Sequence, residues 1–572
     1  MGSPSTLRGV SRVAAFAVLA MAALGQMAVS VSAASPSFFV DGKHGSDSNA
    51  GTSLGSAFKT VKAGLWALRY GGTLDVVGYD DYVYYEQMTG SQWFINGTPT
   101  TPVVIRAYGY GSPGAVRPIV SGAKVVSRPG DGKWVRPDAV HAPDVWVTSW
   151  TTAIPGYASS VRDFHQERVF VDVSQPLVRP ATTTLAALQA TPGSQYWDGL
   201  HLYVRLGGWG SISGASLDPN DHTVEIPTYT GILVSSGSNY VQVLGFRIRH
   251  TTMGVGFTGT ASHDLVQDVD ASYDYTMGFF TASSYNTFRR VTGTRNTIQL
   301  VKLDNGADHN LVEYALGTEN MGQGVKLTGS ATQYNTVRYS TFSGGKDVPV
   351  NQGGYGGYVQ GIDIEQGANH NTIMSNRIER NRRGLMLYQV SSSGGMLTGN
   401  AIKYNTFIGN DTAVVLWDGK YTTSQGKGSV TFFRNTYIDN TKGVSSESYT
   451  SGKLFAQETF YRTGTVKTQS HSTFYIKKGW ISVRNSIISG SAGYHFYAAV
   501  GANINVSYTS FWSTGLGARN SSTRVVLGTK AVHLAPGFLS YDPLAADYLT
   551  IGPSSATYRL GSSGGPVGAR WR

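Results

Sequence analysis

Between residues 231 and 418 one short segment recurs eight times, as GILVS (231–235), GVGFT (254–258), GFFTA (278–282), LVKLD (300–304), GVKLT (324–328), GIDIE (361–365), GLMLY (384–388) and AVVLW (413–417). Apolar and variable residues alternate within the copies, which is typical of a short β-strand with one buried face. Most copies begin 22 to 24 residues after the previous one. A period of this length, with one strand and its turns per copy, predicts stacked coils around a continuous core. The predicted fold class is therefore all-β, a parallel β-helix (solenoid).

The alternation also predicts which residues of these strands face solvent. If the first residue of each copy is position 1, positions 2 and 4 are apolar in most copies and should point inward, while positions 3 and 5 point outward. Three successive coils carry a charged residue at position 3, namely Lys302, Lys326 and Asp363. In five successive coils position 5 carries Asp304, Thr328, Glu365, Tyr388 and Trp417. Coils stack about 4.8 Å apart, so each set should form a column, and this concentration of charge is the strongest functional signal in the chain.

Composition limits the classes of partner. The chain has 572 residues, of which only 14% are charged, and its formal net charge is +11. A mild basic excess suits an anionic partner. The sequence contains no basic run, no zinc-finger spacing and no RNA-binding aromatic motif, so nucleic acid is not an expected partner. Cysteine is absent, which rules out disulfide bonds and thiolate metal sites. We expect a monomer.

The N-terminus has the pattern of an export signal. Arg8 and Arg12 precede an apolar run over residues 13–31, and small residues follow at 32–35. A charged start, an apolar centre and a small-residue cleavage site predict a signal peptide over residues 1–34, cut near Ala33 or Ala34. The mature protein would then be secreted and would have no membrane segment. The alternative interpretation is an uncleaved membrane anchor.

The rest of the chain divides into four parts. Residues 35–133 contain a predicted helix at about 57–69 and the first coils. Residues 134–230 interrupt the repeat with a small β-rich insertion that is dense in Trp and Tyr. Residues 231–520 form the core of the solenoid with its charged face, and residues 521–572 form a closing segment.

Both ends of this arrangement resemble a known group of proteins. Landmarks between residues 37 and 78 are similar to the start of many secreted right-handed parallel β-helix proteins, chiefly polysaccharide lyases and glycoside hydrolases: Asp41-Gly42, Gly45-Ser46-Asp47, Gly51-Thr52, Phe58-Lys59-Thr60 and Gly71-Gly72. The tail resembles their closing segment in Pro536-Gly537-Phe538 and Tyr541-Asp542-Pro543-Leu544. The resemblance implies a right-handed helix whose ends are covered, which prevents edge-to-edge association.

One strand suggests a catalytic base. GVKLTG (324–329) resembles the GFKLGG strand of family nine pectate lyases, in which the lysine removes the proton, and this implies the same role for Lys326. Elimination from a uronate needs a base for a weakly acidic C5 proton and a positive group to neutralise the carboxylate. Lys302, one coil away, would favour loss of the proton from Lys326. The alternative is a lysine ladder that is only solvated.

The next strand suggests a calcium site. In GIDIE, Asp363 and Glu365 resemble the acidic strand of family six lyases, which cleave alginate and dermatan and hold calcium beside a catalytic lysine. The resemblance implies Asp363, Glu365 and Asp304 as calcium ligands, because calcium binds several hard oxygens. The chain departs from both families. The aspartate cluster of family nine is missing, and His370 and Tyr388 stand near the Lys and Arg of family six. The alternative is simple pairing of lysine and carboxylate across neighbouring coils.

These observations predict a secreted lyase that cleaves an acidic, uronate-containing polysaccharide by β-elimination. The expected catalytic residues are Lys326, Lys302, Asp363 and Glu365, and the expected substrate-binding residues are Tyr388, Trp417, Arg383 and His370. The first alternative is a glycoside hydrolase that uses the same Asp and Glu residues as acid and base. The second is a solenoid that binds carbohydrate without cleaving it, because a fold does not determine an activity.

Overall fold

The computed structural model describes the chain over residues 36–86, 95–154, 169–180, 182–208, 215–228, 231–234, 237–348, 359–389, 395–417, 428–446, 449–512 and 525–571. The expected signal peptide lies outside these residues. Within them, no helix has the length and hydropathy needed to cross a bilayer.

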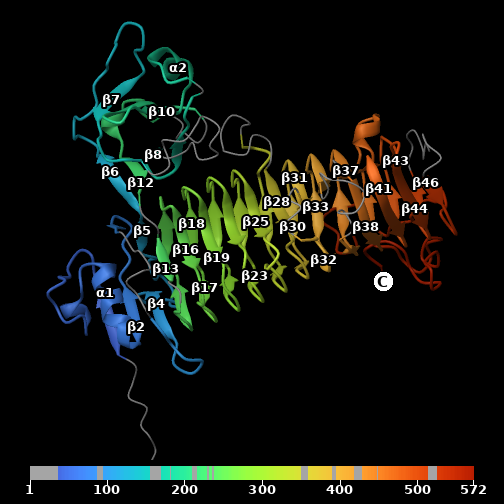
Figure 1. Ribbon diagram of the computed structural model, residues 1–572, viewed down its shortest axis with the longest axis horizontal. Helices are drawn as coiled ribbons and strands as arrows, with labels where there is room; N and C mark the ends of the chain where they lie inside the picture. Colours follow the sequence, from blue (N-terminus) through green and yellow to red (C-terminus); the bar gives the residue numbers. More distant parts are fainter. Residues whose placement is uncertain are drawn as a thin grey trace, which may run out of the picture.

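Three long parallel sheets run along the described chain and enclose one core, so the predicted parallel β-helix is confirmed (Figure 1). Sheet A contains, in spatial order, β1 (Ser37–Val40), β2 (Thr73–Val76), β4 (Val103–Ala107), β14 (Val241–Leu244), β17 (Leu265–Gln267), β20 (Thr287–Arg289), β23 (Leu311–Glu313), β26 (Thr336–Arg338), β29 (Thr372–Met374), β32 (Asn400–Lys403), β35 (Val430–Phe433), β38 (Tyr449–Ala456), β41 (Lys478–Arg484), β44 (Ala502–Ser507) and β46 (Val525–Leu527). Sheet B contains β3 (Val83–Tyr85), β5 (Ile119–Ser121), β15 (Arg247–Arg249), β18 (Asp270–Ser272), β21 (Thr292–Thr294), β24 (Leu316–Thr318), β27 (Thr341–Ser343), β30 (Arg377–Glu379), β33 (Thr406–Ile408), β36 (Thr436–Ile438), β39 (Thr459–Tyr461), β42 (Ile487–Ser489) and β45 (Ser510–Trp512).

Sheet C is the repeat that the sequence analysis began with. It contains β13 (Ile232–Val234), β16 (Met253–Phe257), β19 (Met277–Thr281), β22 (Gln299–Leu303), β25 (Gln323–Thr328), β28 (Gln360–Glu365), β31 (Arg383–Tyr388), β34 (Thr412–Trp417), β37 (Lys442–Ser446), β40 (Phe474–Ile476) and β43 (Phe496–Ala498). The predicted inward positions are confirmed, because Val325, Leu327, Ile362 and Ile364 are fully buried. Burial of each such side chain contributes about 1.5–3 kcal/mol.

Asparagine ladders fasten the corners between the sheets. Between sheets C and A, the backbone N–H of each rung donates to the side-chain oxygen of the rung on the next coil, at 2.8–3.0 Å, through Asn286, Asn310, Asn335, Asn371 and Asn400. Similar ladders occupy the corner between sheets A and B, with Asn376, Asn405 and Asn435, and the corner between B and C, with Asn381, Asn410 and Asn440. The ladders satisfy backbone donors that would otherwise be buried without partners.

The corner between sheets C and A also carries a stack of rings. Their centroids lie 4.8–5.3 Å apart, in the order Tyr240, His263, Tyr285, His309, Tyr334 and His370. All six residues have a positive φ between 53° and 62°. This left-handed backbone is unfavourable for residues other than glycine, so the stack and the ladder beside it hold the corner in a conformation that it would not adopt alone.

The N-terminal end of the solenoid is capped by a helix, as expected. Helix α1 (Val61–Ala67) follows the short turn η1 (Leu54–Ser56) and continues into η2 (Leu68–Tyr70). The side chain of Thr60 accepts a hydrogen bond from the Ala63 N–H and so caps the helix. The buried side chains Val61 and Leu65 belong to the same core as Leu74 of β2. The α-helix is shorter than the predicted 57–69, because Thr60 supplies the cap inside that range.

The insertion consists of two small antiparallel sheets with their own core. The first contains β6 (Ala123–Ser127), β12 (Val224–Pro227), β8 (Val169–Val171) and β9 (Gln175–Leu177), and the second contains β10 (Ser194–Trp197), β11 (His201–Arg205) and β7 (Trp146–Ser149). Helix α2 (Leu185–Ala190) and the turn η4 (Pro219–Asp221) complete it. Figure 1 shows these elements projecting from the N-terminal part of the solenoid. The expected range was 134–230, but the first sheet begins at Ala123 because β6 pairs with β12, about a hundred residues later.

The turn η5 (Gln469–His471) and the last coils come next along the chain. The C-terminal residues then pack on the outer face of sheet B. Phe538, Ile551 and Val567 form a cluster with Ile438 of β36 and Ile487 of β42. Near the chain end, the Arg434 guanidinium lies 3.4 Å from the centre of the Trp571 ring. The segment therefore fastens several coils to one another.

The ladders lead to a prediction about stability. Asn335 is fully buried, accepts from Asn310 and donates to the Ala307 carbonyl and to Asn371. Asn335→Ala should lower the free energy of unfolding by about 1–3 kcal/mol, because buried partners lose their hydrogen bonds. Urea unfolding followed by circular dichroism measures this change. The control Asn503→Ala removes the same group at an exposed strand position and should change the value by less than about 0.5 kcal/mol. Equal effects of the two substitutions would contradict the structural role of the ladder.

Candidate functional site

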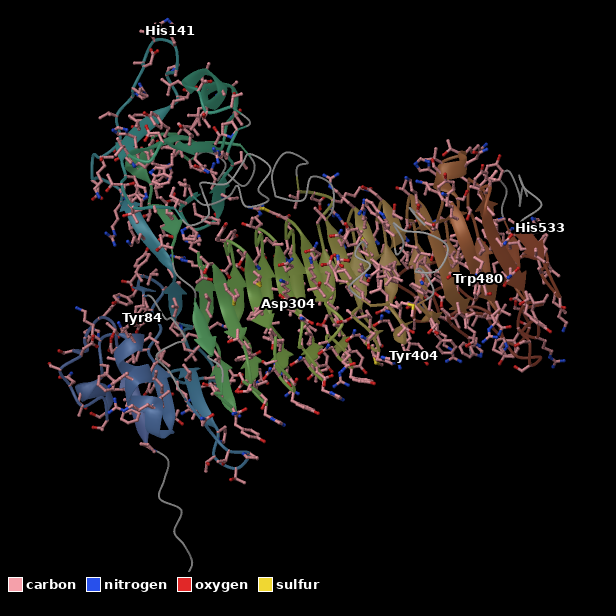
Figure 2. All side chains as sticks on the ribbon, in the orientation of Figure 1. Tyr84, His141, Asp304, Tyr404, Trp480 and His533 are labelled. Carbon is pink, nitrogen blue, oxygen red and sulfur yellow. The ribbon has the colours of Figure 1, made fainter. Side chains whose placement is uncertain are left out.

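The outward face of sheet C brings the predicted charged residues together in columns. Lys302 of β22 pairs with Lys326 of β25, and Lys326 pairs with Asp363 of β28. In the neighbouring column, Glu365 lies between Thr328 and Tyr388, and Tyr388 lies beside Trp417. Asp304 is the first residue after β22 and is labelled on the green coils in Figure 2. The predicted columns are therefore confirmed.

Lys326 and Glu365 form the central ion pair of this face. The Lys326 Nζ lies 2.7 Å from Glu365 Oε1, and the two side chains are 13% and 12% exposed. The Thr328 hydroxyl also donates to Glu365 Oε1, at 3.0 Å. The pair runs diagonally between coils, from position 3 of one to position 5 of the next. Because both groups are largely removed from water, the loss of one partner would leave the other as a poorly solvated charge.

Lys302 and Asp304 form a second pair, which is more exposed. The Lys302 Nζ lies 2.7 Å from Asp304 Oδ2, and the side chains are 23% and 30% exposed. The two residues belong to the same coil, and the ammonium also lies 5.8 Å from the centre of the Phe280 ring. Asp304 is therefore engaged on its own coil by Lys302.

The expected calcium ligands do not form a calcium site by themselves. Calcium takes roughly six to eight oxygen ligands. Among the residues that the structure describes, no group of three or more His, Asp or Glu side chains lies close enough to hold a metal ion. Asp304 is engaged by Lys302, and Glu365 by Lys326. The described donor set therefore does not fit calcium, and no catalytic step is assigned to that ion.

Asp363 is the most unusual group on this face. It points outward in register with Lys326, yet it is only 3% exposed. Burial, together with the negative charge of Glu365, raises the pKa of Asp363 to about 8, although Lys326 and Arg383 oppose the shift. Within the described structure its Oδ1 has no hydrogen-bond partner. Burial therefore favours the neutral form of Asp363, which lies beside the ion pair of Lys326 with Glu365.

Three of the expected substrate-binding residues lie together on the following coils. The rings of Tyr388 and Trp417 meet edge to face, with centroids 5.4 Å apart. The Arg383 guanidinium lies 5.9 Å from the centre of the Trp417 ring, and its Nη1 donates to the Met386 sulfur at 3.2 Å. Such an arrangement can offer a sugar ring an aromatic surface and a charged donor.

His370 has a different position. It belongs to the ring stack on the corner between sheets C and A, where it packs against Tyr334 with a centroid distance of 5.3 Å. Its Nδ1 lies 2.7 Å from Asn369 Oδ1. These contacts give His370 a part in holding the corner, and its place five residues after Glu365 sets it on the next side of the coil.

The sequence analysis missed a glutamine column beside the lysines. Gln299, Gln323 and Gln360 occupy the same register on β22, β25 and β28, and their amides hydrogen-bond along the axis at 2.8 and 2.9 Å. All three are buried on the outward face. A signal was present, because a glutamine precedes the first residue of each of these three copies. It was missed because the alternation was followed only from position 2 onward.

The two ion pairs predict different coupling energies. Lys326→Met and Glu365→Gln should each destabilise the protein, and the double variant should lose about 1–3 kcal/mol less than the sum of the single losses. Lys302→Met and Asp304→Asn form the matched control cycle, with a coupling below about 1 kcal/mol because that pair is more exposed. Urea unfolding of all six variants measures both cycles. Equal coupling in the two cycles would show that burial does not strengthen the Lys326–Glu365 pair.

Comparisons with known proteins agree with the fold. A family model described as a right-handed β-helix region matches residues 318–460. No curated protein sequence matches the chain. Among solved structures, XylC in complex with xylose is 13% identical, with 87% of this chain and 86% of that chain covered and a TM-score of 0.45. The PL6 family alginate lyase AlyGC is 11% identical, with 83% of this chain and 53% of that chain covered and a TM-score of 0.43. The pectate lyase Pel9A is 12% identical, with 94% of this chain and 96% of that chain covered and a TM-score of 0.35. The parallel sheets and the family match together make the chain a right-handed parallel β-helix.

Proposed function

We propose that this chain is a secreted enzyme that cleaves an acidic polysaccharide by β-elimination. The observation that carries the proposal is the balance of charge on the outward face of sheet C. The described residues of this face carry the cations Lys302, Lys326 and Arg383, and Lys442 of β37 stands in the register of Arg383. The carboxyl groups are Asp304, Glu365 and Asp363, and burial raises the pKa of Asp363 and so favours its neutral form. A face with an excess of positive charge favours a polymer that carries carboxylates.

The residues of this face can supply the groups that β-elimination needs. A base removes the C5 proton of the uronate, the C4–O bond breaks, and the electron pair of the C5–H bond becomes the C4–C5 double bond. We assign the base to the amine of Lys326, after its ammonium proton has passed to Glu365 or to solvent. Lys302 and Arg383 would hold the substrate carboxylate and make the C5 proton more acidic. Asp363 would give its proton to the departing oxygen, so one proton is taken up and one is released.

The base is tested by substitution. Lys326→Ala should lower turnover on uronic-acid polysaccharides by about 10²–10⁴-fold, because general-base catalysis contributes that much. Lys302→Ala should have a smaller effect, since we assign it to binding. Lys478→Ala, an exposed lysine on β41, is the control and should keep full activity. Product formation is followed by the ultraviolet absorbance of the unsaturated uronate, and circular dichroism checks that each variant is folded. If Lys326→Ala keeps most of the activity, Lys326 is not the base.

Glycoside hydrolysis is the alternative, and one observation favours it. A carboxylic acid of raised pKa beside a second carboxyl group is the pairing that hydrolases use as acid and base. Burial raises the pKa of Asp363, and the neighbouring Glu365 pairs with Lys326. The screen should therefore include neutral polysaccharides. It should read reducing ends together with ultraviolet absorbance.

One substitution separates the two reactions. In a lyase, Glu365→Gln should weaken turnover by roughly tenfold, because Glu365 only relays a proton and orients Lys326. In a hydrolase it should cost several orders of magnitude, because a catalytic carboxylate is lost. The products give an independent answer, since hydrolysis in ¹⁸O-labelled water places the label on the anomeric carbon and elimination does not. New reducing ends without ultraviolet absorbance would overturn the lyase proposal. Binding of a polysaccharide without any cleavage would identify a binding solenoid instead.

A further inference from the structure

Most asparagine rungs follow one hydrogen-bonding rule in all three corners, with Asn286 as an exception, because its amide donates to the hydroxyls of Thr281 and Ser283 on its own coil. The side-chain oxygen of a rung accepts the backbone N–H of the previous rung, and its amide nitrogen donates to the carbonyl three residues before that previous rung. Asn335 donates to Ala307, three residues before Asn310. Asn405 donates to Ile373, three residues before Asn376, and Asn410 donates to Ile378, three residues before Asn381. A rung therefore needs one acceptor and one donor at its tip.

Three rungs of these ladders are carboxylic acids. Asp264 accepts the Val241 N–H at 2.8 Å, and its own N–H donates to Asn286. Asp274 accepts the Thr251 N–H at 2.9 Å, and its own N–H donates to Asn296. Glu458 continues the ladder at the corner between sheets A and B, where it accepts a hydrogen bond from the Asn435 N–H at 3.4 Å. Each acid thus stands at a ladder position that other coils fill with asparagine. Its carboxyl group accepts the backbone N–H that the asparagine side-chain oxygen accepts elsewhere.

An aspartate has the shape of an asparagine, so when its first oxygen accepts the backbone N–H its second oxygen stands where the asparagine carries its amide nitrogen. Glu458 is one carbon longer, and the Tyr437 side chain is a neighbour of its carboxyl group. Asp264, Asp274 and Glu458 are 1%, 0% and 0% exposed. Within the described structure, Asp264 Oδ2, Asp274 Oδ2 and Glu458 Oε2 have no hydrogen-bond partner. An ionised carboxylate oxygen can only accept, whereas an asparagine donates from this position to a backbone carbonyl. A protonated oxygen can donate in the same direction, so only the neutral acid can both accept and donate.

We propose that Asp264, Asp274 and Glu458 are protonated rungs of the ladders, and that ionisation of these rungs weakens the stacking of the coils. The three rungs then contribute stability that is present in acid and declines towards alkaline pH. This inference does not depend on the proposed function, because none of the three residues belongs to the face of sheet C.

The groups around the rungs favour the neutral acid. Burial raises the pKa of Asp264 to about 8, opposed only by the Val241 N–H. Burial raises the pKa of Asp274 well above its usual range; the Thr251 hydroxyl and N–H oppose the shift, and the negative Asp270 adds to it. Asp270 in turn faces Arg117, Arg247 and the hydroxyl of Ser272. Burial raises the pKa of Glu458 to about 8 against the lowering effect of Tyr437, Asn435 and the backbone of Arg434.

The sign of the effect on stability follows from these directions. The unfolded chain releases each of these protons near pH 4, whereas the native chain keeps those of Asp264 and Glu458 up to about pH 8. The pKa of Asp274 is raised in the same direction. Above about pH 4 the native state therefore binds more protons than the unfolded state, so the free energy of unfolding falls as the pH rises. The contributions of Asp264 and Glu458 are complete below about pH 4 and are lost as the pH passes through about 8.

The experiment replaces the acids by the amide that the other rungs use. Asp264→Asn and Asp274→Asn, singly and together, keep the shape of the rung and cannot ionise. Thermal unfolding of the full chain is measured between about pH 4 and 8.5. The double variant should match the wild type near pH 4 and should unfold about 2–5 °C higher near pH 8.5. The partly exposed carboxylate of Asp138, whose pKa is lowered, provides the control, because Asp138→Asn should bring no alkaline gain.

A spectroscopic measurement keeps the test independent of stability. The infrared difference spectrum between the wild type and Asp264→Asn near pH 7 should contain the C=O stretch of a protonated carboxylic acid. If it contains a carboxylate band instead, the rung is ionised and the proposal is overturned. Parallel pH profiles of the double variant and the wild type would overturn it as well. Glu458→Gln extends the comparison of pH profiles to the ladder at the corner between sheets A and B.

Discussion

Parallel pairing between neighbouring coils is the interaction on which this structure depends. Each strand must bond to the strands above and below it in register, at a spacing of about 4.8 Å. Side chains at equivalent positions are then forced into columns, whatever their chemistry. The columns bring valine onto isoleucine in the core, asparagine onto asparagine at the corners and lysine onto lysine on the outward face of sheet C. The first two pairings stabilise the stack, whereas the third opposes it and is tolerated because carboxylates lie on the neighbouring column.

The outward face of sheet C differs from an ordinary solvated sheet. Asp363 and the three glutamines point away from the core and are nevertheless buried. Polar groups taken out of water need partners, and here they find them mostly on the next coil, as in the pair of Lys326 with Glu365. Interactions between charges are stronger where water is excluded. The exclusion of water that makes this face unfavourable to assemble also raises the pKa of Asp363.

Much of the fold could be predicted from the sequence, because the alternation within each copy reports directly on burial. Val325 and Lys326 are consecutive residues, yet Val325 faces the core and Lys326 points outward. Side-chain pairs between coils were harder to predict from the sequence, because the diagonal contact of Lys326 with Glu365 depends on side-chain length and on Thr328. His370 was expected at the substrate because it stands near the position of the family six lysine, but the chain turns a corner at Gln366 and carries His370 onto the ring stack. The start of the insertion was missed for a related reason, since β6 has a partner far along the chain.

The C-terminal segment on sheet B changes how the whole molecule resists unravelling. A solenoid whose coils touch only their neighbours can peel from its free end one turn at a time. Here the tail crosses the outside of β36, β39 and β42 and ends against Arg434. A terminal coil cannot detach until this strap has lifted from the coils before it, so the final turns must separate as a block. A protease that trims the tail would convert a collective, all-or-none event into gradual fraying, and the lifetime of the folded protein would then depend on its last thirty-five residues or so.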